Sequence, residues 1–246
     1  MRSTNTRPYR MSRRAALVDQ TRQRITAATA RLHTTVGPAN TSIAAIADEA
    51  GVTRLTVYRH FADLDVLFEA CRAHWRAENP PPNATAWLDV PELEARARRA
   101  LGELYAWFRE HGDELFPIYR DMTSMPLSSQ ERMRDENRRL GDLLLGDDVP
   151  EGKRGRQVRA LARHLVDYRS WRSLTVQQEL TGAEAIDLGV QLLTSIAGGD
   201  PPDRPRQRLP ATQSGKSGSR TSREILPAAV PSGVIRFKPP WLSLTR

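Results

Sequence analysis

Residues 41–61 read TSIAAIADEAGVTRLTVYRHF, and this stretch decides the fold. Its apolar residues predict two short helices, over 43–50 and 53–60, that pack on one another at a steep angle. Gly51 lies between them and suits the positive φ of a tight turn. Ala47, four residues before the glycine, is small where the helices would cross. The stretch therefore predicts a helix-turn-helix, whose second helix can enter the major groove of DNA.

The second helix of this motif has a face suited to DNA. Arg54 and Arg59 can reach O6 and N7 of guanine, and threonine can offer a hydroxyl or a methyl group. Tyr58, His60 and the backbone N–H groups that begin the first helix can bond phosphates. The residues expected to contact DNA are Thr41, Ser42, Thr53, Arg54, Leu55, Thr56, Tyr58, Arg59 and His60. The alternative is two solvent-exposed helices in an unrelated bundle.

Residues 17–79 resemble the DNA-binding domain of the tetracycline-repressor (TetR) family of bacterial regulators. The residues that carry the resemblance are Ile25, Ala28, Gly37, Thr41, Ile43, Ile46, Ala47, Ala50, Gly51, Val52, Thr53, Val57, Tyr58, His60, Phe61 and Leu67. The resemblance implies an all-helical homodimer that binds a palindromic double-stranded operator. It also implies a ligand-binding C-terminal domain and a small-molecule effector that relieves repression.

Two residues depart from the family pattern. The family usually has a small residue where this chain has Leu55, and often a lysine where it has Leu64. Leu55 can contact a thymine methyl group or cover its own helix, whereas Leu64 removes one expected phosphate contact. These departures leave a second function open: a helical ligand-sensing or protein-interaction bundle with only non-specific DNA binding.

Outward from the motif, the chain has a helical pattern nearly throughout and no hairpin signal, so the predicted fold class is all-α. Thr41-Ser42, Thr53, Asp63 and the capping box Thr181-Gly-Ala-Glu184 mark helix starts. Further helices are expected over 17–36, from Asp63 to about Asn79, and over 91–110, 114–122, 128–145, 152–173 and 181–197. Pro117 predicts a late start or a kink in the 114–122 helix.

Four parts are predicted along the chain. They are a flexible basic arm (1–16), the DNA-binding domain (17–79, motif 42–61), a helical regulatory and dimerisation domain (84–199) and a disordered tail (200–246). The tail is predicted because the chain from Gly198 on holds eight of the 17 prolines and little apolar periodicity. The dimer surface is expected on 152–173 and 181–197, packed as a four-helix bundle across the two-fold axis.

The effector pocket is expected in the second domain. Aromatic and methionine side chains there can line a pocket, although core packing is the plainer explanation for each. Because the first helices of this domain line the pocket in relatives, the residues expected to contact the effector are Trp107, Phe116, Tyr119 and Met122.

Charge and composition limit the function classes. The formal net charge is +8, but the positive charge lies at the two ends of the chain. Residues 1–16 carry five arginines and no acidic residue, and residues 200–246 carry nine basic and three acidic residues. Residues 17–199 have a net charge of −3. The single cysteine, Cys71, excludes an intrachain disulfide framework, and the scattered histidines predict no metal site. The sequence has no catalytic or cofactor-binding motif, so we expect a protein that is not an enzyme and has no cofactor. No apolar run approaches the roughly 18 residues of a membrane span, so we expect a cytoplasmic protein.

Overall fold

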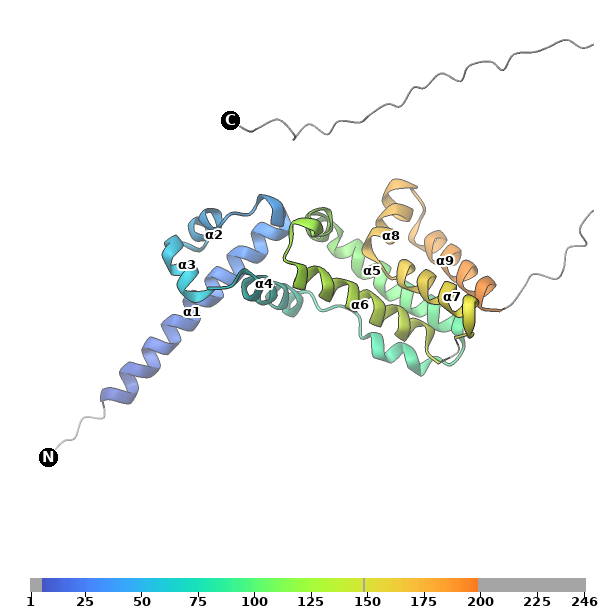
Figure 1. Cartoon of the computed structure of the whole chain (residues 1–246), viewed down its shortest axis with the longest axis horizontal. Helices are drawn as coiled ribbons and strands as arrows, with labels where there is room; N and C mark the ends of the chain where they lie inside the picture. Colours follow the sequence, from blue (N-terminus) through green and yellow to red (C-terminus); the bar gives the residue numbers. More distant parts are fainter. Residues whose placement is uncertain (1–5, 148, 199–246) are drawn as a thin grey trace, which may run out of the picture. The chain divides into compact units, whose positions relative to one another are not determined.

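The computed structural model describes residues 6–147 and 149–198, with the side chains of residues 6–14 excepted. These residues form helices and no strand, which confirms the predicted all-α class (Figure 1). The α-helices are α1 (Thr6–Thr35), α2 (Ile43–Ala50), α3 (Arg54–His60), α4 (Leu64–Glu78), α5 (Leu93–Arg120), α6 (Leu127–Leu145), α7 (Gly152–Leu165), α8 (Tyr168–Arg172) and α9 (Gly182–Ala197). Short 3₁₀ turns lie at Pro38–Asn40, Ala84–Asp89 and Met122–Ser124, and a π turn at Ser173–Gln177. The predicted tail at 200–246 lies outside the described residues.

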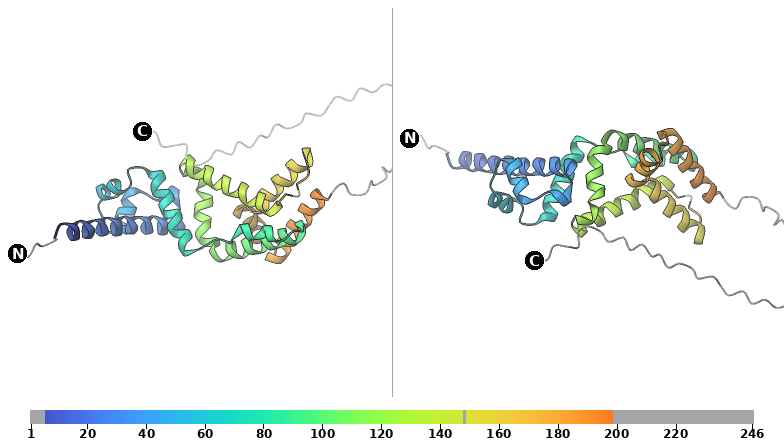
Figure 2. Two further views of the ribbon diagram at one scale, coloured as in Figure 1. Left: turned by 90° about the horizontal axis from the view of Figure 1, so that it is seen from below. Right: turned by 90° about the horizontal axis from the view of Figure 1, so that it is seen from above.

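The first helix is longer than predicted. It begins at Thr6 rather than at 17, so residues 6–16, expected as part of a flexible arm, continue α1. The reason is that no glycine or proline interrupts 9–36, arginine and alanine favour helix, and Pro8 falls in the first turn, where proline is tolerated. Both views in Figure 2 show the N-terminal part of α1 extending past α2 and α3.

Helices α1–α4 share one small core. Its buried members are Ile25, Ala28, Ile46, Ala47, Ala50, Val57, Phe61 and Leu67. The predicted caps form: Ser42 accepts from the Ala45 N–H, and Asp63 accepts from the Asp65 N–H at 2.8 Å. The helix-turn-helix therefore folds against α1 and α4 as the sequence pattern predicts.

The prediction of separate helices over 91–110 and 114–122 is wrong, because α5 runs unbroken from Leu93 to Arg120 through Pro117. The Asp113 carbonyl loses its helix bond to the missing Pro117 N–H, but Asp113 is exposed and water can bond it. Packing from α8 supports the segment, since the Tyr168 hydroxyl donates to the Gly112 carbonyl at 2.7 Å. The Trp171 ring also packs closely against Gly112, since a Cβ atom added to this glycine would lie only 2.9 Å from the ring.

The single helix predicted over 152–173 is instead two helices, α7 and α8. The Leu165 carbonyl, at the end of α7, accepts a hydrogen bond from the Tyr105 hydroxyl of α5 at 3.1 Å. Asp167 then caps α8 by accepting from the Arg169 N–H at 2.7 Å. The last predicted helix is confirmed as α9, with the Thr181–Glu184 capping box formed.

Helices α5–α9 enclose the larger core. Its buried large side chains are Trp87, Leu101, Leu104, Tyr105, Phe108, Leu115, Leu144, Leu145, Val158, Leu165, Val166, Tyr168, Trp171, Val190 and Leu193. Gly189 of α9 lies close to α5 and α7, where a Cβ would be 3.1 Å from side-chain atoms of Leu101 and Leu165. No helix in the described part of the chain is both long enough and apolar enough to span a membrane.

Candidate functional site

The turn between α2 and α3 is held by backbone geometry and by a residue of α1. Gly51 has φ 62°, as predicted, and the Val52 N–H donates to the Ala47 carbonyl at 2.9 Å. The Arg24 guanidinium of α1 donates to the carbonyls of Ala50 and Gly51, which end α2. The turn that sets the angle between the two helices is therefore held by groups of α1, of α2 and of the turn itself.

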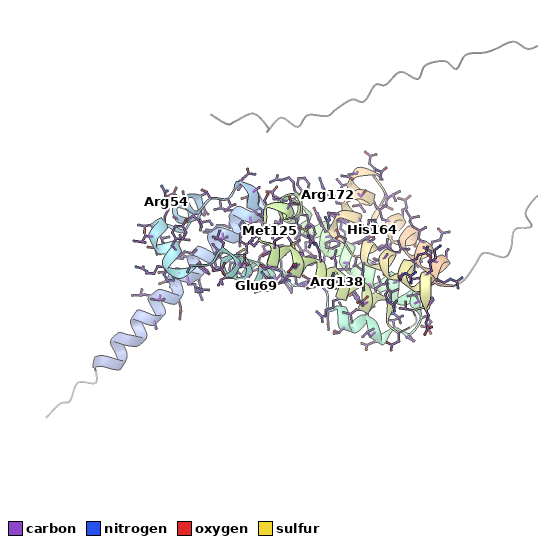
Figure 3. The ribbon with its side chains drawn as sticks, viewed as in Figure 1. Arg54, Glu69, Met125, Arg138, His164 and Arg172 are labelled. Carbon is purple, nitrogen blue, oxygen red and sulfur yellow. The ribbon has the colours of Figure 1, made fainter. Side chains whose placement is uncertain are left out.

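Helix α3 has one buried side and one exposed side. Val57 is fully buried, whereas Leu55 is 75% exposed and Tyr58 is 53% exposed. Arg54 and Arg59 are exposed, and neither has a hydrogen-bond or ion-pair partner among the described residues. Arg54 lies on the outer surface of this motif (Figure 3). The exposed side of α3 therefore presents two unpaired guanidinium groups to solvent.

The hydroxyl groups of the motif already make bonds within the protein. Thr41 donates to the Gly37 carbonyl at 2.9 Å, and Ser42 accepts from the Ala45 N–H at 3.1 Å. Thr53 accepts from the Thr56 N–H at 3.2 Å, and the two hydroxyls are 2.9 Å apart. Ser42 and Thr53 thereby cap the starts of α2 and α3, and the other first N–H groups of each helix remain as donors for an anion.

The end of α3 is braced by a residue that sequence reasoning missed. Arg22 of α1 donates to the His60 carbonyl at 2.6 Å, and its guanidinium lies 4.0 Å from the Phe61 ring centre. Burial, followed by the charges of Arg59 and Arg22, lowers the pKa of His60. Neither Arg22 nor Arg24 could be found from the motif alone, because both reach it only through tertiary packing of α1.

A second feature is a cavity of about 280 Å³, with walls from α1, α4, α5 and α6. Of the predicted effector residues, Trp107 and Tyr119 line it. Phe116 and Met122 do not: Phe116 lies beneath the Arg172 guanidinium at 4.1 Å, and Met122 is buried in the turn after α5. Leu115 lines the cavity, and the single-residue step of about 100° from Leu115 to Phe116 takes the Phe116 side chain to another face of α5.

Helices α4 and α6 supply the charged part of the wall, which sequence reasoning also missed. Glu136 accepts from Arg72 at 2.8 Å and pairs with Arg76 at 2.6 Å.

The apolar part of the wall includes Trp75, which packs edge-on against Trp107 with the ring centres 5.7 Å apart. Met125, labelled in Figure 3, also lines the cavity. The Asp63 cap predicts where α4 begins, but it does not indicate what the buried face of this helix surrounds.

One part of the cavity wall holds a neutral histidine–cysteine pair. The Cys71 sulfur lies 3.5 Å from His33 Nδ1 and 3.1 Å from the Phe68 carbonyl. Burial lowers the pKa of His33 to about 4 and raises the pKa of Cys71 to about 12. Neither group carries a charge near neutral pH, and Cys71 is a buried free thiol.

Among the described residues, no three His, Cys, Asp or Glu side chains lie close enough together to hold a metal ion. In a comparison with protein families, residues 25–71 match the family model described as "Bacterial regulatory proteins, tetR family". The matched segment runs from the middle of α1 to the middle of α4 and spans the helix-turn-helix. No curated protein matches the chain.

Proposed function

We propose that this chain, which belongs to the TetR family of bacterial regulators, is a repressor that binds a palindromic operator as a homodimer and leaves it when a small molecule binds. Membership of the family makes it a DNA-binding transcriptional regulator. The observation that carries the proposal is the exposed side of α3, where Arg54 and Arg59 stand unpaired on a helix anchored by Val57. We place the protein in the bacterial cytoplasm with its DNA, and we assign it no catalytic activity.

In the proposed complex, α3 lies in the major groove. Arg54 bonds O6 and N7 of a guanine, since a guanidinium without a protein partner loses no ion pair on binding. Leu55 contacts a thymine methyl group, and Tyr58 and Arg59 bond phosphates. Ser42 and Thr53 cap the starts of α2 and α3 and direct the first backbone N–H groups toward phosphates, and Thr41, Thr56 and His60 lie beside them as further phosphate contacts.

The homodimer is proposed to form through 152–173 and 181–197, which contain α7, α8 and α9. Leu188 and Leu192 are one turn apart on α9, and they are 37% and 44% exposed. A second copy that covers them would form a four-helix bundle across a two-fold axis. Two copies of α3 would then enter major grooves about 34 Å apart on a palindromic site.

Release by an effector is supported by the place of the cavity. Ala30 and His33 on its wall belong to α1, and Cys71 and Trp75 belong to α4. Both helices also support the helix-turn-helix core, so a ligand that separates or rotates them shifts α3. By linkage, DNA must weaken effector binding by the same factor that the effector weakens DNA binding.

A gel shift with the DNA upstream of the gene itself tests the proposal. We expect Arg54→Ala and Tyr58→Ala to abolish sequence-specific binding while the dimer stays intact by analytical ultracentrifugation. Arg109→Ala is the matched control, because Arg109 is an exposed arginine of α5 away from the motif. Unchanged specific binding by the α3 variants would refute the proposed site.

The exposed Leu55 and Leu64 favour one alternative, a ligand-sensing or protein-interaction bundle that binds DNA without sequence preference. In that case binding would fall steeply with salt and would be equal for operator and random DNA. Competition between the two DNAs at fixed salt separates the two functions.

A further inference from the structure

The end of α5 is bonded to the turn that leads into the helix-turn-helix. The Asp121 carboxylate accepts the Ala39 N–H at 3.1 Å, and the Arg120 guanidinium donates to the Val36 carbonyl at 2.9 Å. Val36 and Ala39 belong to the segment between α1 and α2. The regulatory helices therefore hold the backbone immediately before the motif.

The Arg120–Asp121 pair is itself held in one arrangement. The guanidinium donates to both carboxylate oxygens, at 2.7 and 2.9 Å, and Asp121 is only 8% exposed. The hydrogen bond from Arg120 lowers the pKa of Asp121 more than burial raises it, and the Ala39 N–H lowers it further. Asp121 is therefore a charged acceptor near neutral pH, and a hydrogen bond to a charged acceptor is stronger than one between neutral groups.

Gly37 makes room for this contact. It is buried and has φ 92°, a conformation that favours glycine. A Cβ atom on Gly37 would overlap the Asp121 carboxylate and would lie 2.5 Å from the Arg120 guanidinium. The backbone of the turn can therefore approach the pair only because this position has no side chain.

The turn passes this constraint on to α2. The Thr41 N–H donates to the Pro38 carbonyl at 3.2 Å, and the Thr41 hydroxyl donates to the Gly37 carbonyl at 2.9 Å. Ser42, the next residue, caps α2. The contact with Ala39 thus lies three residues before the cap of the helix whose first N–H groups are proposed to meet phosphate.

We propose that Asp121, held by Arg120, is a positioning residue for operator binding, because it fixes the turn that places the start of α2 on the DNA. Asp121 acts through Ala39 and needs no contact with DNA itself. This inference rests on the proposed function, since the position of α2 affects binding only if its start meets phosphates. A residue of the regulatory helices thereby takes part in DNA binding.

Hydrogen exchange of the free full chain tests whether Asp121 holds the turn. Asp121→Ala removes the acceptor of the Ala39 N–H, whereas Asp121→Asn keeps an oxygen atom in its place. We expect the Ala39 amide to exchange at least about tenfold faster in Asp121→Ala, as for a lost hydrogen bond to a charged group, and within about threefold of wild type in Asp121→Asn. Unchanged exchange in Asp121→Ala would overturn the proposal.

A gel shift with operator DNA tests the effect on binding, at a temperature where circular dichroism shows every variant folded. Asp121→Ala should weaken operator affinity by about tenfold or more, and Asp121→Asn should restore it to within about threefold of wild type. Asp135→Ala is the matched control, because it removes an exposed carboxylate that pairs with Arg138 on α6. Operator affinity that is unchanged in Asp121→Ala, or lowered equally in Asp135→Ala, contradicts a positioning role.

A double-mutant cycle with Ser42→Ala tests whether Asp121 acts through the start of α2. If both residues serve the same phosphate contact, the double variant should bind at most about threefold more weakly than the weaker single variant. Independent roles would instead multiply the two losses, and that result would overturn the assigned route.

The exchange measurement uses no DNA, so the two proposals can fail separately. If wild type binds no operator, the proposed function fails, whereas exchange at Ala39 still decides whether Asp121 holds the turn. If wild type binds its operator specifically and Asp121→Ala binds equally well, the positioning role fails and the regulator stands.

Discussion

The helix-turn-helix and the helices α5–α9 use arginine in opposite ways. On α3, Arg54 and Arg59 are exposed and have no partner among the described residues. On α5, Arg96 is buried and donates to the carbonyls of Leu144 and Leu145 at 2.9 and 2.6 Å. The first use leaves charge free for a partner molecule, whereas the second joins two helices. Arginine content alone therefore says little about function, and the surroundings of each guanidinium decide it.

The two regions also differ in how far apart in sequence the residues of each site lie. The exposed side of α3 comes from seven consecutive residues and their caps. The cavity wall draws side chains from α1, α4, α5 and α6, which lie far apart in sequence. A local site can be found by its motif, whereas a site of this second kind requires the packed structure.

The largest effect should come from the buried arginine. Arg96→Met removes the guanidinium that bonds the last two carbonyls of α6 and leaves these buried acceptors without it. We therefore expect the free energy of unfolding to fall by about 3 kcal/mol or more. Urea denaturation followed by circular dichroism measures it. Arg99→Met is the control, since Arg99 makes an exposed pair with Glu103 worth under about 1 kcal/mol. Similar losses in both variants would break the contrast between structural and free arginines.

A pH effect of similar or smaller size is expected at His33. Because burial lowers its folded-state pKa from 6.5 to about 4, the unfolded chain binds a proton that the folded chain does not. Stability is therefore full above pH 6.5 and is lost as pH falls toward 4, by about 3 kcal/mol at most. His33→Gln should flatten this part of the pH profile of urea unfolding. An identical slope in the variant would show that another group is responsible.

Two glycines should respond with opposite sign. Gly51→Ala places a side chain at φ 62° and a Cβ 3.0 Å from Arg24, so we expect a loss of about 1–2 kcal/mol. Gly102 lies inside α5 with open space around its Cβ position, so Gly102→Ala should gain about 0.5–1 kcal/mol. Thermal melts of both variants compare the strained turn with an ordinary helix. A stabilised Gly51→Ala would mean that the turn does not need its glycine.

The smallest effect should separate binding from folding. Leu55→Ala removes a side chain that is 75% exposed, so stability should change by less than about 0.5 kcal/mol. Operator affinity should fall by about fivefold, because an apolar contact with a thymine methyl group is worth about 1 kcal/mol. Leu127→Ala, from a leucine of α6 that is 73% exposed, should leave operator affinity unchanged. A matching loss from both leucines would remove the case for base contact by Leu55.

Much of the first region could be predicted because its determinants are local. Ser42, Thr53 and Asp63 cap helices whose backbone N–H groups lie within three residues. Gly51 adopts the positive φ that its place between two apolar segments predicts. Capping and turn geometry involve neighbours along the chain, so the residue types carry the information.

Where prediction failed, a distant residue decided the outcome. Tyr168 and Trp171 support α5 at Gly112, close to Pro117, although the sequence predicts two helices there and a late start or a kink at the proline. Tyr105 takes the carbonyl of Leu165, which helps to end α7 where the apolar pattern continues. An unfavourable residue such as glycine or proline costs a helix about 1–3 kcal/mol in free energy. A buried hydrogen bond contributes free energy of similar size, so it can offset that cost.

The sequence by itself determined the all-helical class, the helix-turn-helix and the exposed side of α3. Those follow from periodicity, caps and one glycine, which act over a few residues. Only the tertiary structure decided which aromatic side chains line the cavity, and it placed Trp107 and Tyr119 there but not Phe116 and Met122. It also brought Arg22 and Arg24 of α1 onto the motif and left the Trp107 N–H without a partner. Pairing between groups distant in sequence depends on how helices pack, and no local pattern encodes that.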